Sequence, residues 1–399
     1  METNRAPGWR LGAIDAVRGA VMILMALDHV RDFFSRAAMS FSPTDLTRTT
    51  PALFLTRWVT HFCAPAFVFT AGIGAFLWWQ HNRTRKQLAV FLLTRGLWLL
   101  AMELTVMRFA YDFSFSRSNP VFLLVLWVFG GCMVAMAALV WLPTGLLAGL
   151  SIAVIALHDC LDSVRASRFG AAAGVWNTIH QPGAFRLAGH VLIVGYPLAP
   201  WLAVMLAGFC FGRVFLMEAG KRRRILIATG VAAALGFVVL RALNAYGDPA
   251  PWSAQKSATY TALSFLNCTK YPPSLAFLLM TLGPVLLAFA YFERIPLQAA
   301  NPLLVFGRVP FFYFVLHFYA AHASASFLAW LRYGRASLAF LFHPLPSMGG
   351  PSELFPQGFG YDLWVAYAMW ALIVVGLYPV CRWFAGVKAR RRDWWLSYL

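Results

Sequence analysis

The chain has 399 residues, of which 60% are hydrophobic and 12% are charged, and its mean hydropathy is +0.65. A soluble globule of this length needs a larger charged surface, so the composition excludes one and indicates a polytopic membrane protein. The formal net charge of +18 could suggest nucleic-acid binding, but the basic residues lie between apolar runs rather than in one patch. We therefore expect a protein of the lipid bilayer with no nucleic-acid partner.

Apolar stretches long enough to cross a hydrocarbon core of about 30 Å occur at ten places in the sequence. They run approximately over residues 12–34, 52–79, 87–107, 120–141, 144–158, 187–216, 225–245, 273–292, 302–330 and 361–385. The sequence thus predicts an all-α bundle of about ten transmembrane helices, forming a single transmembrane domain over residues 1–399 with short tails at 1–11 and 386–399. The fifth stretch is short and the sixth is interrupted by Pro197 and Pro200, so the count could shift by one.

Compact runs of lysine and arginine fall on one side of such a ten-helix arrangement. They occupy the N-terminal tail (Arg5, Arg10), the loop at 83–86, the loop at 221–224 and the C-terminal tail at 388–392. Basic loops are retained in the cytoplasm, so we expect both termini there. Trp394, Trp395 and Tyr398 follow the last basic run and suit an interfacial anchor for the tail.

The stretch at residues 10–34 is apolar enough to span a bilayer, yet it contains several ionisable side chains. On a helix, residues spaced by three or four positions share one face, and here that face carries Asp15, Arg18, Met22, Met25, His29 and Asp32. A charged group near the bilayer centre costs roughly 2.5–3.5 kcal/mol, so this face should turn toward the bundle or a wet cavity. A structural Asp15–Arg18 pair, with His29 and the aspartates reaching the outer interface, remains an alternative.

The histidines concentrate on the predicted outer side. Only His81 falls in a cytoplasmic loop, and loop placement predicts solvated side chains for His158, His180 and His343. His29 and His61 come to similar depth on two helices of opposite direction, so they could face one cavity. Tyr313 and His317 lie one helical turn apart and either line a pocket or satisfy each other's polar groups.

Two features of the third and fourth stretches indicate structural roles. Arg95 and Glu103 share a helix face, and Glu103 lies near Arg108 and Asp112, which predicts a salt-bridged network. Gly130 and its neighbour Gly131 predict close helix packing.

The six cysteines lie far apart and form no CxxC or Cys/His metal spacing. This argues against a zinc site and a disulfide scaffold, leaving a Cys160–Cys268 pair open, and we expect no metal. The basic N-terminus leads into a charged helix, so no cleaved signal peptide is expected.

Five strings carry a family resemblance: IDAVRGAVMILMALDH, THFCAPAFVFTAGIGAF, GYPLAPWLAVMLAGFCFG, TKYPPSLAFLLMTLGP and FGRVPFFYFVLH. With them the chain resembles, over nearly its whole length, bacterial inner-membrane proteins related to the catalytic domain of heparan-α-glucosaminide N-acetyltransferase. The resemblance implies a multipass inner-membrane protein that transfers an acyl group from cytoplasmic acetyl-CoA, or another acyl-CoA, to an acceptor on the opposite face. The sequence departs from the family pattern, because residues 35–57 contain no histidine, and His29 and His61 replace Asn and Asp.

Acyl transfer from a thioester needs a base that takes the proton of the acceptor, and a histidine can do so near neutral pH. We predict that His29 is this base, oriented by Asp28, Asp32 or a carboxylate from another helix, with His61 as a second catalytic candidate. Arg18 could hold a phosphate or pantetheine oxygen of the donor, and His317 is a second candidate for donor binding.

Three functions stay open at this level. An acyltransferase would hold a through-membrane cleft between a CoA site and a site for a small-molecule or glycan acceptor. A transporter of a small polar solute would hold a midplane site between internal repeats, and a non-catalytic membrane protein would need neither. The absence of internal symmetry in the sequence and the outward histidines favour the acyltransferase. Homo-oligomers are possible for each of the three.

Overall fold

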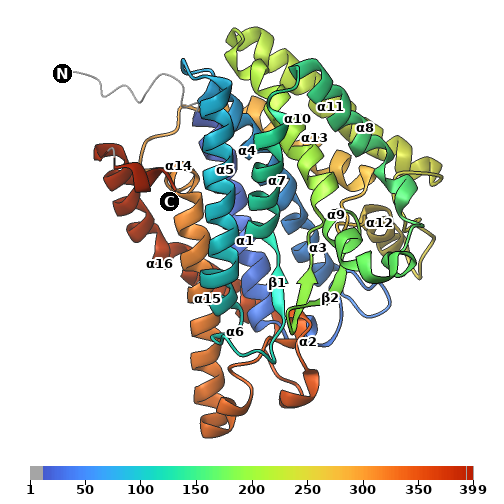
Figure 1. Ribbon diagram of the computed structural model, residues 1–399. Helices are drawn as coiled ribbons and strands as arrows, with labels where there is room; N and C mark the ends of the chain where they lie inside the picture. Colours follow the sequence, from blue (N-terminus) through green and yellow to red (C-terminus); the bar gives the residue numbers. More distant parts are fainter. Residues whose placement is uncertain (1–11, 392, 399) are drawn as a thin grey trace.

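The computed structural model describes residues 12–391 and 393–398 (Figure 1). Its first eight helices are α1 (Gly12–Phe34), α2 (Arg36–Ser40), α3 (Pro51–Val59), α4 (Cys63–Trp79), α5 (Arg85–Met102), α6 (Arg108–Asp112), α7 (Val125–Leu139) and α8 (Thr144–Leu157). The next eight are α9 (Ala173–Ile179), α10 (Leu198–Phe211), α11 (Ala219–Leu243), α12 (Ala258–Leu266), α13 (Leu275–Phe292), α14 (Pro302–Arg308), α15 (Pro310–Tyr333) and α16 (Leu363–Arg390). The strands are β1 (Val121–Leu123), β2 (Gly183–Leu187) and β3 (His190–Val194).

The expected all-α polytopic bundle is confirmed. Among the described residues, eight helical segments are long and apolar enough to cross a membrane: Pro51–Trp79, Arg85–Asp112, Thr144–Leu161, Leu198–Leu216, Ala219–Leu243, Leu275–Phe292, Pro310–Ala339 and Leu363–Arg390. Helix α1 has the length but carries several charges, and the apolar helix α7 has only 15 residues. Each of the ten predicted stretches therefore contains a helix, and eight of these meet the length and composition expected of a membrane span.

Two predicted helical stretches begin with strands instead. β2 and β3 form a hairpin in which Leu187 pairs with His190, and β1 pairs in parallel with β3. The hairpin turn is Ala188–Gly189, and both residues have positive φ, as a two-residue hairpin turn requires. Strand β3 is rich in β-branched residues, which favour a pleated strand over a helix. The predicted span at 187–216 was therefore too long, and its helix begins only at Leu198.

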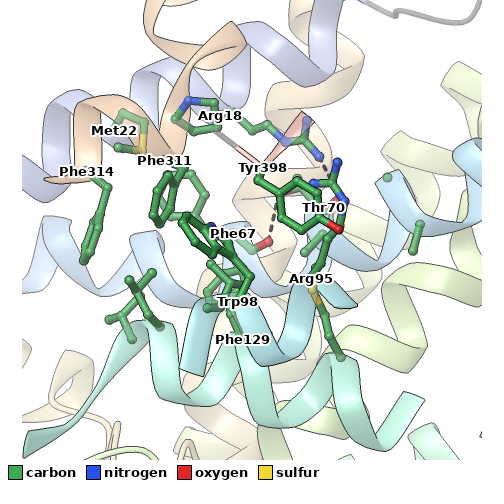
Figure 2. A pocket seen from close by; sticks show the side chains of 18 of the residues that line it. Arg18, Met22, Phe67, Thr70, Arg95, Trp98, Phe129, Phe311, Phe314 and Tyr398 are labelled. Atoms are coloured by element: carbon green, nitrogen blue, oxygen red, sulfur yellow. Dashed lines mark hydrogen bonds between the residues drawn. The ribbon is translucent and has the colours of Figure 1, made fainter. Parts of the chain in front are cut away.

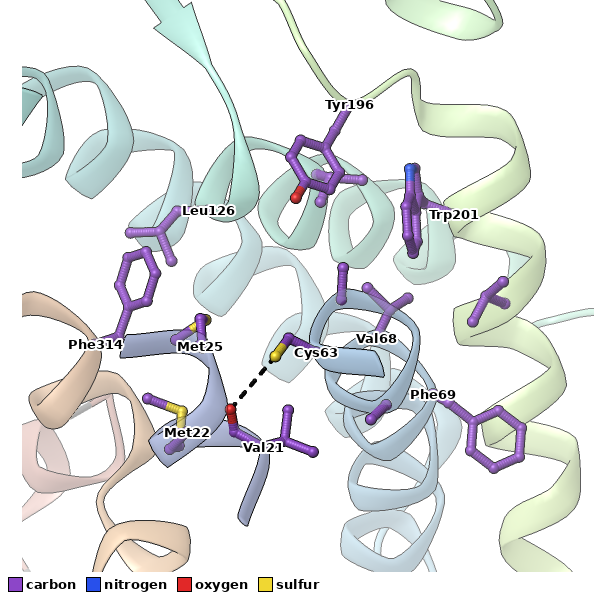
Figure 3. Packing of buried hydrophobic residues seen from close by; sticks show 14 of the residues in the cluster. Val21, Met22, Met25, Cys63, Val68, Phe69, Leu126, Tyr196, Trp201 and Phe314 are labelled. Carbon is purple, nitrogen blue, oxygen red and sulfur yellow. Dashed lines mark hydrogen bonds between the residues drawn. The ribbon is translucent and has the colours of Figure 1, made fainter. Parts of the chain in front are cut away.

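Helix α1 lies at the centre of the bundle, where it contacts α4, α13, α14, α15 and α16. Gly19 permits the closest of these approaches, because a Cβ there would collide with the backbone of Leu303. Figure 3 shows Val21, Met22 and Met25 of α1 packed toward α4, where the Cys63 thiol lies 3.5 Å from the carbonyl oxygen of Val21. The ionisable face of α1 therefore turns into the protein, as the sequence predicted.

Glu103 has a different role from the predicted salt-bridge network. It lies in a π-helical turn (Glu103–Met107) and accepts hydrogen bonds from the Tyr111 hydroxyl at 2.9 Å and from backbone N–H groups of Leu124, Leu126 and Trp127 at 2.9–3.2 Å. These N–H groups belong to the first turn of α7 and have no partner within that helix. Glu103 is thus the N-terminal cap of a neighbouring helix.

The predicted close packing of the fourth stretch is confirmed. A Cβ built at Gly130 would lie 2.7 Å from the carbonyl oxygen of Gly96 on α5, so α5 and α7 approach at backbone distance. The six cysteines are all free, and the Cys160–Cys268 pair left open by the sequence does not form.

The basic turns lie together at one end of the bundle. Figure 1 places the α4–α5 turn (residues 80–84) and the α10–α11 connection (residues 212–218) at the end opposite the sheet and α2. Arg5, Arg10 and Arg392, which also entered the orientation argument, lie outside the described residues.

Candidate active site

The C-terminal half of α1 lines a cavity of about 1130 Å³, which we call the outer cavity. Its walls come from the sheet, from the end of α2 and the residues that follow it (38–43), and from the 346–352 loop before α16. The side chains that give it polar character are Asp28, His29, Arg31, Asp32, Ser40, Ser42, Arg57, Tyr111, Tyr196, Tyr271, Ser347 and Ser352. The hairpin that the sequence did not predict therefore forms part of the candidate site.

The N-terminal half of α1 lines a second cavity of about 360 Å³, the inner cavity. Figure 2 shows Arg18, Arg95 and Tyr398 toward one side of it and Phe314 on the other. Arg18 donates a hydrogen bond to the carbonyl oxygen of Thr70 at 2.9 Å. The Arg95 guanidinium lies 5.2 Å from the Tyr398 ring centroid. This cavity has aromatic walls and two guanidinium groups, and the predicted donor-site residue Arg18 lies in it.

The two cavities share part of their lining. Val125 and Phe314 contact both of them, and on α1 the lining passes from Met25 in the inner cavity to His29 in the outer one. One helical turn separates these two α1 residues, a rise of about 6 Å. The cavities therefore meet behind a thin apolar layer, with His29 on its outer side.

The hydrogen bonds of His29 define its tautomer. Nδ1 of His317 lies 2.8 Å from the backbone carbonyl oxygen of Tyr313, and because a carbonyl can only accept, this nitrogen carries the proton. In neutral His317 the Nε2 atom is then an acceptor, and it lies 2.7 Å from Nδ1 of His29. His29 must therefore donate from Nδ1, which leaves the lone pair on its Nε2.

The surroundings of His29 keep this lone pair available. Since Nδ1 points at His317, the opposite edge of the ring faces the outer cavity that His29 lines. Within the described part of the chain, Nε2 has no hydrogen-bond partner. The ring stacks on that of His317 with 5.0 Å between centroids, and Phe318 packs edge-on at 4.8 Å. In its neutral form His29 is thus a fixed imidazole with an accepting nitrogen in a cavity, which is the state that a general base needs.

The carboxylates predicted to orient His29 form ion pairs with arginines instead. Asp28 contacts Arg31 at 2.8 Å and Arg57 at 2.5 Å and accepts from the Thr60 hydroxyl at 2.8 Å, while Asp32 binds Arg31 at 2.5 Å. Consecutive helical residues point about 100° apart, so Asp28 faces α3 when His29 faces α15. The imidazole is oriented by another histidine, and the carboxylates form a charge cluster beside it.

His61 and His317 lie elsewhere than the sequence suggested. His61 is on the short 3₁₀ helix η1 (Thr60–Phe62), is 3% exposed, and packs edge-on against Phe277. It lines neither cavity, so the structure does not bring it together with His29. His317 is fully buried behind His29 rather than in the inner cavity, which makes it a positioning residue.

Sequence reasoning missed Arg57, Tyr196 and Tyr271. Arg57 carried a usable signal, because it is a cation within an apolar stretch, whereas the tyrosines carried none. The Tyr271 hydroxyl donates to that of Tyr196 at 3.3 Å. Burial alone would raise the pKa of Tyr271, but Lys270 and Arg57 together hold it below its usual value. The lining of the outer cavity therefore combines the Asp28–Arg57 ion pair with a tyrosine that two cations affect.

Two further histidines contradict the sequence prediction. His158 and His180 were expected to be solvated, but they are only 4% and 3% exposed. The long 159–186 loop is folded into the short helices η3 (His158–Leu161), η4 (Ala166–Ala172) and α9, and Trp176 of α9 packs 5.1 Å from the His180 ring.

A polytopic bundle with a histidine beside the boundary of two cavities defines a multipass membrane protein with a candidate active site. The family model described as "Heparan-alpha-glucosaminide N-acetyltransferase, catalytic" matches residues 10–246, and the chain belongs to this family. The resemblance read from the sequence is thereby confirmed. The match includes Arg18, His29 and the sheet, while His317 and Tyr271 lie beyond it. No curated protein matches the chain.

Proposed function

We propose that this protein transfers an acetyl or similar acyl group from a CoA thioester in the inner cavity to an acceptor in the outer cavity. The acceptor is a hydroxyl or amine of a glycan or another cell-envelope molecule. The observation that carries this proposal is the position of His29, which lines the outer cavity with its ring 6.0 Å from that of Phe314, a residue that also lines the inner cavity. The family membership supports the same reaction class.

The inner cavity suits the donor. Its volume of about 360 Å³ falls within the range of roughly 300–1,000 Å³ usual for small-molecule sites. The apolar walls suit the pantetheine arm and the acyl chain, which would point toward Phe314. Arg18 and Arg95 lie on the other side, where guanidinium groups can bind phosphate or amide oxygens.

The proposed step moves one proton and exchanges one bond. Nε2 of His29 takes the proton from the acceptor as the acceptor oxygen or nitrogen attacks the thioester carbonyl carbon. The tetrahedral intermediate then breaks its C–S bond, and the CoA thiolate leaves with the proton returned by His29. While the imidazolium exists, its Nδ1–H hydrogen bond to His317 becomes charge-assisted and stronger.

We place the inner cavity on the cytoplasmic side of a bacterial inner membrane, with both termini in the cytoplasm. The support is the gathering of the basic 83–86 and 221–224 turns at the end of the bundle opposite the sheet. Acyl-CoA would then enter from the cytoplasm, and the acceptor would enter from the outer face. Only the acyl group would pass between the cavities.

The deciding experiment is binding of acetyl-CoA to the detergent-purified protein by isothermal titration. We expect saturable binding that weakens at least tenfold in Arg95→Met, which keeps the stem but removes the charge. Arg186→Met, at an exposed arginine of β2, is the matched control and should bind like the wild type. A transporter or scaffold has no reason to bind acetyl-CoA, so absence of saturable binding by the folded wild type would overturn the proposal.

A further inference from the structure

Beyond the active site, three ligand-type side chains converge just past the C-terminal end of α8, and a fourth lies beside them. His158, Asp159 and Asp162 follow one another at the end of α8, and His180 comes from the end of α9. One ligand atom each of His158, Asp162 and His180 lie within 4.8 Å of one another. Asp159 adds a carboxylate oxygen 3.4 Å from Nδ1 of His158.

The atoms that face this cluster are buried without hydrogen-bond partners in the described part of the chain. They are Nδ1 of His158, Nε2 of His180 and Oδ1 of Asp159. Leaving a buried nitrogen or carboxylate oxygen without a hydrogen bond costs about 1–3 kcal/mol of folding free energy. Three such atoms in one cluster therefore call for a common explanation. A cation that accepts their lone pairs satisfies all of them at once.

The outer contacts of these residues hold the lone pairs toward the cluster. Nε2 of His158 lies 3.0 Å from the carbonyl oxygen of Pro273, so this nitrogen carries the proton and Nδ1 is the lone-pair atom. The second oxygen of Asp159 accepts the N–H of Leu275 at 3.0 Å. Histidines that bind metals donate their other ring N–H to a backbone carbonyl or carboxylate in this way.

We infer that His158, Asp162 and His180 form a structural zinc-class metal site, with the Asp159 carboxylate beside His158 as the candidate fourth ligand. Two imidazoles with carboxylates are a ligand set typical of Zn²⁺. Ligands about 2.0–2.1 Å from a tetrahedral zinc lie roughly 3.3 Å apart. The His180–Asp162 pair is separated by 3.3 Å, and the three ligand atoms of His158, Asp162 and His180 lie within 4.8 Å of one another, so side-chain movements of about 1 Å would bring them to this spacing.

The metal would tie the end of α8 to the wall of the outer cavity. His180 is followed by Pro182 and Gly183, which line that cavity and begin the hairpin. His158 is hydrogen-bonded to Pro273, close in sequence to Tyr271 in the same lining. The metal site would therefore stabilise the wall of the outer cavity. This role does not depend on whether the protein is an acyltransferase.

The test is the metal content of the full chain, purified in detergent without chelators and measured by inductively coupled plasma mass spectrometry. We expect about one zinc per wild-type chain, as for a single structural site. His180→Ala should lose most of it, and His190→Ala, on the hairpin that follows His180 but outside the cluster, should keep it. Added zinc should also raise the melting temperature of chelator-treated wild type and leave that of His180→Ala unchanged.

A second variant protects the test against misfolding. Asp162→Asn keeps the size of the side chain but is a weaker ligand, so it should lower zinc affinity at least tenfold while the protein remains monodisperse. Cobalt added to metal-free wild type should give the visible absorption of a tetrahedral site. If the wild type holds no more zinc than His180→Ala and shows neither a melting shift nor the cobalt band, the cluster is only a hydrogen-bonded one.

Discussion

The hydrogen-bonded pair His29–His317 predicts transfer rates of different size for substitutions of its two members. His29→Ala removes the proposed base, and bases of this kind contribute typically 10²- to 10⁴-fold. His317→Phe leaves the base but removes its 2.7 Å hydrogen bond. A hydrogen bond to a charged group is worth about 1.5–3 kcal/mol. At 1.36 kcal/mol per tenfold, its loss should slow transfer about 10- to 150-fold. The expected order is therefore wild type, His317→Phe and, slowest, His29→Ala.

The assay is transfer of a radiolabelled acetyl group from acetyl-CoA into envelope glycans of membranes that contain the protein, normalised to folded protein. His317→Gln restores an acceptor at similar reach and should recover part of the rate. Asp15→Asn is expected mainly to lower the yield of folded protein, because the buried Asp15 carboxylate lies 3.9 Å from the Arg308 guanidinium and its loss leaves that charge uncompensated. Transfer by His29→Ala at the wild-type rate would remove His29 from the mechanism.

If His317→Phe and His29→Ala lose the same fraction of the transfer rate, the positioning role assigned to His317 would be wrong. It would mean that the second ring does more than orient the first, since a positioning residue should cost less than the base. An unchanged rate in His317→Phe would show that the tautomer of His29 is set elsewhere.

Three further predictions follow from the fold. Glu103→Gln should lower the melting temperature, because the side-chain NH₂ group cannot accept hydrogen bonds from the first N–H groups of α7. Each N–H group left unsatisfied costs roughly 1–3 kcal/mol of folding free energy. Glu353→Gln, at an exposed position, is the control. In a cysteine-free background, His29→Cys should react with a polar thiol reagent and His61→Cys should be protected, and equal reactivity would contradict the separation of these side chains. Reporter fusions should place both termini in the cytoplasm, and an external C-terminus would reverse the assignment of the cavities.

Helix α1 shows how much of the site was predictable. Its charged face required a protein interior by the cost of burying ions in lipid, so the inward turn of Arg18 and His29 followed from sequence alone. The partner of His29 did not, because His317 is 288 residues away and only tertiary packing brings the rings together. The carboxylates nearby in sequence were the obvious partners, but the helical rotation directs Asp28 elsewhere.

The errors in the loops have a common physical cause. Strand β3 lies within an apolar run, where a short buried strand and the start of a helix look alike. The burial of His158 and His180 depends on α9 folding back against the end of α8, and no local pattern predicts that return. Sequence periodicity thus located the membrane helices, whereas the packing of the long loops depends on tertiary contacts that only the structure reveals.

The apolar layer shared by the two cavities also has a consequence for the energy supply of the cell. A bilayer that stores a proton gradient cannot contain an open passage, and Val125 and Phe314 keep the cavities apart as two compartments instead of one pore. An acyl chain bound in this layer would itself block the passage of ions. If the proposed transfer takes place here, the same few side chains must both block ion leakage and let the acyl group pass. A substitution that enlarges the opening would then raise turnover and lower the membrane potential.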